Sequence, residues 1–181
     1  MHVTQAILTR RSHKLFRGTP LPDADLKHLL ELAIWAPNHK FTEPWRFTVL
    51  PKRAFPKLWD AVQAAADSDK ARAKLSKLKE IIDGAGAAIA IRQVRSPDNA
   101  ERDREDYAAC AIACQHIQLG AWERGWASYW TTSPGFLGGS LGEFWQTAPG
   151  ESLVGVIFLG EAAIGMPAVR RHPAESLAVW L

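Results

Sequence analysis

Hydrophobic residues recur along this chain with two different spacings, which distinguish helices from strands. An alternating or continuous apolar pattern predicts strands over residues 45–50, 87–94, 126–131 and 153–160. Apolar residues spaced three and four apart predict helices over residues 3–11, 21–36, 56–66, 69–79, 100–124 and 141–146. The helix over 69–79 is strongly basic, and we expect it to face solvent.

Two of these segments are expected at the centre of the molecule. The middle of the helix over 100–124 is apolar on all sides, which predicts that it is buried. The strand over 153–160 is continuously apolar, which is typical of a strand covered on both faces. Pro37 and Gly125 mark helix ends, because proline disfavours helix in the residue before it and glycine often follows a helix.

The order of the elements predicts an α+β fold. We expect a three-layer sandwich with a mixed sheet of about four to five strands flanked by helices, in a single domain over residues 1–181. The tail, residues 161–181, has little periodicity and no core of its own. It is therefore expected to pack on a partner chain, which suggests an intertwined dimer.

Charge argues against a nucleic-acid partner. The 22 basic and 19 acidic residues give a net charge of +3, and the two signs are interleaved instead of forming a basic stripe. The longest apolar runs are too short to span a bilayer, and the N-terminus lacks the pattern of a secretory signal. We expect no membrane association and a cytoplasmic location.

Two cysteines, Cys110 and Cys114, lie four residues apart in an alanine-rich stretch. One helical turn cannot hold a disulfide at that spacing, and no zinc-binding spacing is present. We expect both to be small core residues in a reducing compartment, and we expect no metal site.

The first candidate for chemistry is Arg10-Arg11-Ser12, followed by His13 and Lys14. Guanidinium groups bind phosphate oxygens in a bidentate way, and a hydroxyl fills the remaining acceptor positions. The sequence therefore indicates a phosphate site. The alternative is that arginines simply favour the end of a helix.

The second candidate is the segment 35–45, which breaks a helix at Pro37 and opens a strand with Pro44 and Trp45. Backbone amides and polar side chains on such a rigid edge suit a flat heteroaromatic ring with acceptors along its rim. The third candidate is the run of Trp130, Thr131 and Thr132, where hydroxyls at a strand end can reach a ring or a phosphate. Ordinary turn residues are the alternative for both segments.

The run Gly84-Ala85-Gly86 resembles the start of a dinucleotide fingerprint, but it follows a helix and precedes a strand. The fingerprint requires the opposite order. We therefore do not assign it to a cofactor.

Taken in order, these motifs resemble the FMN-dependent nitroreductase family, in particular its short members of the YdjA type. The resemblance rests on Arg-Arg-Ser near the N-terminus, the run 36–40, Pro44-Trp45 before an aromatic strand, and Trp130 with two small polar residues after a long helix. It covers nearly the whole chain. It implies an intertwined homodimer with two FMN sites at the interface.

The resemblance also implies roles for individual residues. The expected FMN-binding residues are Arg10, Arg11, Ser12, Trp35, Asn38, His39, Lys40, Pro44, Trp45, Trp130, Thr131, Thr132, Arg170 and Arg171. Within this set, Trp35 and His39 match positions that reach FMN from the other subunit, and Arg170 or Arg171 would supply a late basic residue to the phosphate. The catalytic residue is not identified, although His39 is a candidate proton donor.

The implied reaction is transfer of hydride from NAD(P)H to an electron-poor acceptor, such as a nitro compound, a quinone or another small aromatic, by a ping-pong scheme. Three alternatives stay open. One is another flavin reaction on the same scaffold, such as dehalogenation, enone reduction or oxidation of a bound intermediate. The second is a flavin-binding protein without turnover, and the third is a basic nucleic-acid-binding module.

Overall fold

A computed structural model describes residues 1–167 and 171–181. Its helices are α1 (Val3–Thr9), α2 (Asp23–Ala33), α3 (Phe55–Ala64), α4 (Asp69–Arg72), α5 (Leu75–Gly84), α6 (Ala100–Glu123), α7 (Pro134–Leu137) and α8 (Leu141–Phe144). Its strands are β1 (Trp45–Pro51), β2 (Ala87–Val94), β3 (Ala127–Thr131) and β4 (Glu151–Gly160). Short 3₁₀ turns, η1 (His39–Phe41), η2 (Lys52–Ala54) and η3 (Ala174–Leu177), complete the set.

The predicted strands all form, and most predicted helices form with small shifts at their ends. The prediction of a single helix over 69–79 is wrong, because α4 ends at Arg72 and α5 begins only at Leu75. Helix α2 ends at Ala33 instead of reaching Ala36. None of the described helices is long and apolar enough to cross a membrane.

The α+β class is confirmed, with a sheet of four strands in the order β1-β2-β4-β3. Each pair of neighbouring strands is antiparallel, so the prediction of a mixed sheet is wrong. In the part of the chain that the structure describes, parallel pairing occurs only at an isolated bridge between Ser12 and Ser128. The prediction that the strand over 153–160 is central is correct, since β4 lies between β2 and β3.

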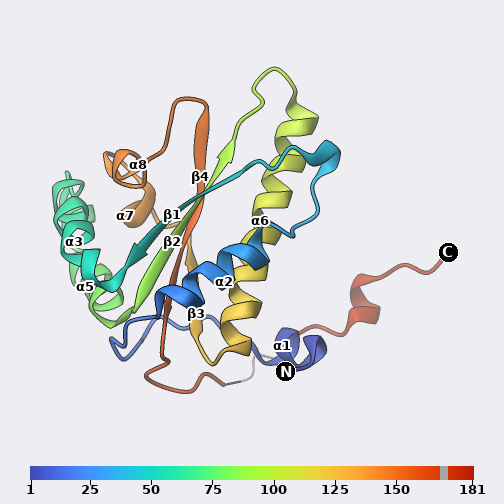
Figure 1. Cartoon of the computed structure of the whole chain (residues 1–181), viewed down its shortest axis with the longest axis horizontal. Coiled ribbons are helices and arrows are strands. Elements are labelled where there is room, and N and C mark those ends of the chain that lie inside the picture. The colour runs from blue at the N-terminus through green and yellow to red at the C-terminus, as the bar shows by residue number, and fades with distance from the viewer. Residues whose placement is uncertain (168–170) are drawn as a thin grey trace.

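Helices cover both faces of the sheet and create two cores (Figure 1). On one face, α2 and α6 pack against side chains such as Ile89, Ile157 and Leu159. On the other face, α3, α5, α7 and α8 pack against Val156 and Phe158. Because β4 alternates between these two cores, its residues are apolar on both sides.

Helix α6 is buried on one side only. Cys110 and Cys114 lie on its buried side and are free, as expected, and burial raises the pKa of each thiol to about 12. Tyr107 and Ile112, on the same helix, are exposed in the single chain. The prediction of burial on all sides is therefore only partly correct for one chain.

Glycines at the end of α5 allow the N-terminal segment to lie against the sheet. A Cβ atom at Gly84 would lie 2.8 Å from the carbonyl oxygen of Phe16, and one at Gly86 would overlap the carbonyl oxygen of Thr19. This close approach explains the run Gly84-Ala85-Gly86, which has the helix-then-strand order that we expected from the sequence.

Candidate functional site

The N-terminal segment runs along the edge of the sheet beside β3. The backbone N–H of His13 donates to the carbonyl oxygen of Ser128 (2.9 Å), next to the bridge between Ser12 and Ser128. The segment continues beside the chain that follows β4, where the N–H of Ala163 donates to the carbonyl oxygen of Leu15 (3.1 Å). The first and third sequence motifs are therefore neighbours in space.

Arg10 is partly buried, and its guanidinium lacks partners. Its Nε and Nη1 atoms are buried without a hydrogen-bond partner among the described residues. Burial lowers the pKa of Arg10, and the charges of Arg11 and Arg171 lower it further. Buried donors without acceptors are costly, so this arrangement fits an anion that is bound there.

The tail reaches this cationic position. Arg171 lies close enough to Arg10 to influence its pKa, which fits the expectation of a late basic residue near the phosphate. The other candidate, Arg170, lies outside the described residues. Clustered like charges repel, so their proximity again favours a bound anion.

Arg11 has a different environment. Its Nη1 donates to the carbonyl oxygens of Leu8 (2.8 Å) and Arg10 (2.9 Å), and its Nε donates to that of Pro167 (3.4 Å). These bonds satisfy carbonyl groups at the end of α1, as in the helix-end alternative. Arg11 is therefore less free than Arg10 to bind a phosphate.

A cleft of about 710 Å³ opens beside this segment. Its walls come from the N-terminal segment, α5, the end of β3, the start of α7 and the chain after β4. The lining residues are Ser12, His13, Lys14, Leu15, Lys74, Lys77, Leu78, Glu80, Ile81, Tyr129, Ser133, Phe136, Ile164 and Met166. The Lys14 Nζ atom lies 5.1 Å from the centre of the Tyr129 ring, so its charge sits beside an aromatic wall.

The side chains of β3 divide between the two faces of the sheet. Tyr129 lines the cleft, whereas Trp130 packs beside Gly155 against the α2–α6 core. Trp130 Nε1 is buried without a partner in the described part of the chain. Thr131 is buried and its Oγ1 accepts from the N–H of Ser133 (3.1 Å), while Thr132 is exposed.

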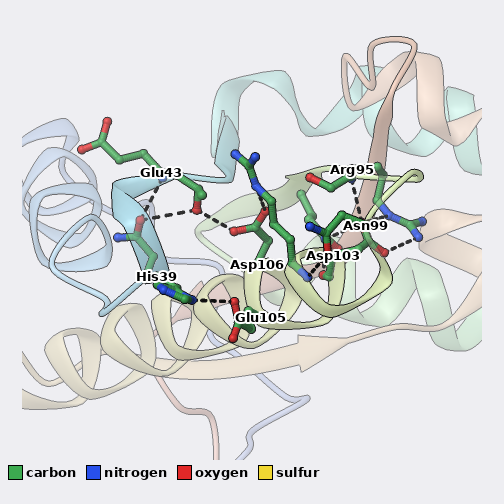
Figure 2. A network of polar contacts seen from close by, with 12 residues as sticks. His39, Glu43, Arg95, Asn99, Asp103, Glu105 and Asp106 are labelled. Carbon is green, nitrogen blue, oxygen red and sulfur yellow. Dashed lines mark hydrogen bonds and ion pairs between the residues drawn. The ribbon is translucent and has the colours of Figure 1, made fainter.

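The second motif forms a rigid loop at the amino-terminal half of α6 (Figure 2). The backbones of Lys40, Phe41 and Glu43 have positive φ angles of 55°, 51° and 44°, which residues other than glycine rarely adopt. The Asn38 Oδ1 atom accepts from the N–H of Glu43 (3.0 Å). Buried Asp106 accepts from the hydroxyl of Thr42 (2.5 Å), so α6 holds the loop in place.

This loop exposes its ring-bearing side chains. Trp35 is 79% exposed and Phe41 is 90% exposed. The His39 Nδ1 atom lies 2.9 Å from the Glu105 carboxylate, which fixes the orientation of the imidazole (Figure 2). Lys40 is also exposed, whereas Trp45 is buried at the start of β1.

Residues of the segment 35–45 do not line the cleft in the single chain. Trp35 instead borders a separate hollow beside α1 and α6. Pro44 accepts a backbone bond from Val94 and begins the sheet. The structure therefore brings the first and third sequence motifs side by side and leaves the second on a different surface. Of the residues predicted in the first and third motifs, Ser12 is the one in the cleft lining.

Several cleft residues were not singled out from the sequence. Lys74 and Lys77 belong to the basic segment that we expected to face solvent; both are exposed, as predicted, and they also line the cleft. Tyr129 precedes the residue that we chose on β3. Strand alternation separates Tyr129 from Trp130, but it does not identify which of them faces the cleft.

The described residues contain no group of three or more His, Cys, Asp and Glu side chains that could hold a metal ion.

Comparison with known proteins identifies relatives across most of the chain. Residues 7–161 match the model of the nitroreductase family. A Bacillus subtilis protein, YfhC, named as an NAD(P)H nitroreductase, is 33% identical over 129 residues. That alignment spans 68% of this chain and 66% of YfhC, just under two thirds of its length.

Solved structures share the fold. A nitroreductase-like protein from Bacillus cereus has a TM-score of 0.90 at 27% identity, covering 100% of this chain and 96% of that one. A Desulfovibrio desulfuricans protein, described as a nitroreductase in complex with FMN, has a TM-score of 0.80 at 24% identity. The comparison covers 100% of this chain and 98% of that protein.

The polar network at the start of α6 makes stability depend on acid pH. Bidentate bonds from Arg95 and the N–H of Ser96 lower the pKa of Asp103 to about 2 (Figure 2). A carboxyl whose pKa is lowered by folding stabilises the fold above its unfolded pKa, and this contribution is lost as pH falls through the folded value.

We therefore expect Asp103→Asn to lower the free energy of unfolding by about 1 kcal/mol at neutral pH. The difference from the unmodified chain should shrink between pH 4 and pH 2, because the carboxyl of the unmodified chain becomes protonated there. Urea unfolding at several pH values measures it. Asp69→Asn, at a fully exposed carboxylate, is the control. A difference that is independent of pH would contradict this account.

Proposed function

The chain belongs to the nitroreductase family, and from that premise we propose that it is an FMN-dependent oxidoreductase that transfers hydride from NAD(P)H to an electron-poor acceptor. The observation that carries the proposal is the partly buried guanidinium of Arg10, whose Nε and Nη1 have no partner among the described residues and which lies two residues before Ser12 of the cleft lining. A nitro compound or a quinone is the acceptor class that we propose.

The residues present fit the phosphate of FMN. A phosphomonoester carries nearly two negative charges at neutral pH and offers three acceptor oxygens. Arg10 has buried donors without partners among the described residues, and Arg171 lies nearby. Ser12 adds a hydroxyl at the edge of the cleft. We infer that Arg10 is the main phosphate ligand, with Arg11 in a supporting role.

The cleft fits a flat ring system with polar edges. Phe136, Ile164 and Met166 supply apolar surface, and Ser133 supplies a polar group. Its volume of about 710 Å³ lies within the range of small-molecule sites. Thr132, exposed at the end of β3, stays a candidate contact. Trp130 and Thr131 would support the strand from inside.

When bound, FMN supplies the redox chemistry by accepting hydride from NAD(P)H and delivering electrons to the acceptor. The chain's own contribution is positioning and charge. Lys14 places an ammonium group in the cleft, where a fixed cation favours negative charge that develops on a bound ring. NAD(P)H and the acceptor would enter the same cleft in turn, which is a ping-pong scheme.

A second copy of the chain would complete the site. Trp35, Asn38, His39 and Lys40 lie away from the cleft of their own chain, on the rigid loop beside α6. We propose that this loop reaches the cleft of a partner chain in a homodimer. There His39, oriented by Glu105, would either donate a proton or orient the ring.

Exposed apolar side chains support the dimer. They lie on α1, on the loop, on the outer side of α6 and on the tail, which extends from the body in Figure 1. They include Val3, Ile7, Leu8, Trp35, Phe41, Tyr107, Ile112, Leu177, Val179 and Trp180. Exposed apolar surface on this scale is typical of a protein interface.

The proposed function has a direct test in an absorbance spectrum of the purified protein. We expect a yellow protein whose flavin bands bleach when NADH or NADPH is added without oxygen and return when a nitroaromatic or a quinone is added. A protein that stays colourless with added FMN would refute the function. Bound flavin without NAD(P)H oxidation would instead indicate a binding protein without turnover.

We expect Arg10→Ala to weaken FMN binding by about 10- to 100-fold, because each hydrogen bond to a charged group contributes about 1.5–3 kcal/mol. Arg11→Ala should weaken it less, since its guanidinium is already bonded to backbone carbonyls. Quenching of FMN fluorescence during titration measures both affinities. Arg53→Ala, at an exposed position in η2, is the control. Equal affinities of the Arg10 variant and the unmodified chain would remove the phosphate role.

Deletion of residues 173–181 should shift the protein from dimer to monomer and lower its FMN content. The reason is that the exposed apolar residues of the tail would lose their partner surface. Light scattering after gel filtration measures the mass. Glu175→Gln, a polar change within the same tail, should leave it unchanged. A truncated chain with the mass and the FMN content of the full chain would contradict the role of the tail.

A further inference from the structure

The basic segment between residues 69 and 79 carries five cations, namely Lys70, Arg72, Lys74, Lys77 and Lys79. Two of its cations are neutralised, since Arg72 pairs with Asp69 (2.8 Å) and Lys79 pairs with Asp83 (2.6 Å). Lys70, Lys74 and Lys77 have no ion pair within the described ranges 1–167 and 171–181. These three lysines are therefore available to an anionic ligand.

Each of these unpaired lysines faces a hollow. Lys74 and Lys77 line the cleft, and Lys70 and Lys74 line an adjoining groove of about 370 Å³. Lys74 and Leu78 belong to both, so the cleft and the groove meet at these two residues. The two hollows therefore lie side by side, with the N-terminal segment on one of them, Lys70 on the other and Lys74 on both.

The groove has an apolar floor and a cationic rim. Val62, Leu75 and Leu141 supply apolar surface, and glycines of the segment 135–139 form one wall without side chains. Asp67 is the one carboxylate in its lining, against the two lysines. The lining therefore carries a net positive charge beside a surface that suits a flat ring.

We propose that this groove binds the ADP half of NAD(P)H, with Lys74 and Lys70 on the diphosphate and the adenine on the apolar floor. This inference rests on the proposed function and adds a site to it. A dinucleotide whose nicotinamide enters the cleft must extend its diphosphate and adenosine outward from that cleft. A lysine ammonium is a common phosphate ligand, and Lys74 stands where the cleft meets the groove.

The charge of the groove distinguishes the dinucleotide from a small acceptor. An uncharged nitro compound or quinone has no group for a pair of ammonium ions outside the cleft. The diphosphate of NADH or NADPH carries two negative charges in the middle of the molecule, between its two rings. The order from cleft to lysines to apolar floor matches the order of groups in the dinucleotide.

The experiment measures binding of ADP, which cannot exchange hydride, to the flavin-loaded protein by calorimetry. We expect ADP to bind and to compete with NADH in steady-state kinetics. Lys70→Glu should lower ADP affinity and raise the KM for NADH by about tenfold or more, with kcat little changed. Lys74→Glu should act in the same direction. Lys70→Arg should retain affinity, because it keeps the charge.

Lys57→Glu is the matched control, since it reverses an exposed lysine on α3 outside the groove lining. It should leave ADP binding unchanged. ADP affinity that is the same in Lys70→Glu and the unmodified protein would overturn the inference, as would ADP that binds without competing with NADH. Flavin absorbance is recorded first. A colourless protein would refute the proposed function, whereas a yellow protein with unchanged ADP affinity would refute only this inference.

Discussion

The candidate site depends on the close packing of residues 10–19 against the sheet. This segment lies beside β3 at Ser128 and beside the chain after β4 at Ala163. Side chains are missing where it passes nearest, at Gly84, Gly86 and Gly160. Because the segment is anchored on both sides, Ser12 and Lys14 take fixed positions in the cleft lining, and Arg10 lies two residues before Ser12. The packing that anchors residues 10–19 on the sheet therefore also fixes the positions of the side chains that would bind the ligand.

The cations of the described residues differ in whether they have an ion-pair partner. Several are neutralised by nearby carboxylates, such as Arg95 by Asp103 and Arg124 by Asp25. Arg10 and the lysines of the cleft and groove have no ion pair among the described residues. An unpaired cation gains most from an anionic ligand, so the phosphate and diphosphate proposals draw on the same physical property at two places.

Sequence periodicity predicted the strands and the central place of β4, because burial on both faces leaves a continuous apolar run. Strand direction depends on pairing between distant segments, and the local pattern therefore missed the antiparallel direction of all four strands.

The same limit applied to the prediction of the site. Arg10 was singled out because its residue type carries the chemistry, whereas Lys74 was missed because only the fold brings the start of α5 beside the N-terminal segment. In the homodimer that we propose, the loop around His39 reaches the cleft of a second chain, and a pattern within one chain does not describe such a contact.

The burial of both cysteines has a consequence for an enzyme of the proposed kind. Quinones are electrophiles that alkylate thiolates, and the thiolate is the reactive form of cysteine. Cys110 and Cys114 are the two cysteines of the chain; both are fully buried on α6, and burial raises the pKa of each to about 12. Burial therefore shields both thiols from such compounds, which protects the two cysteines from alkylation by the molecules that we propose the protein reduces.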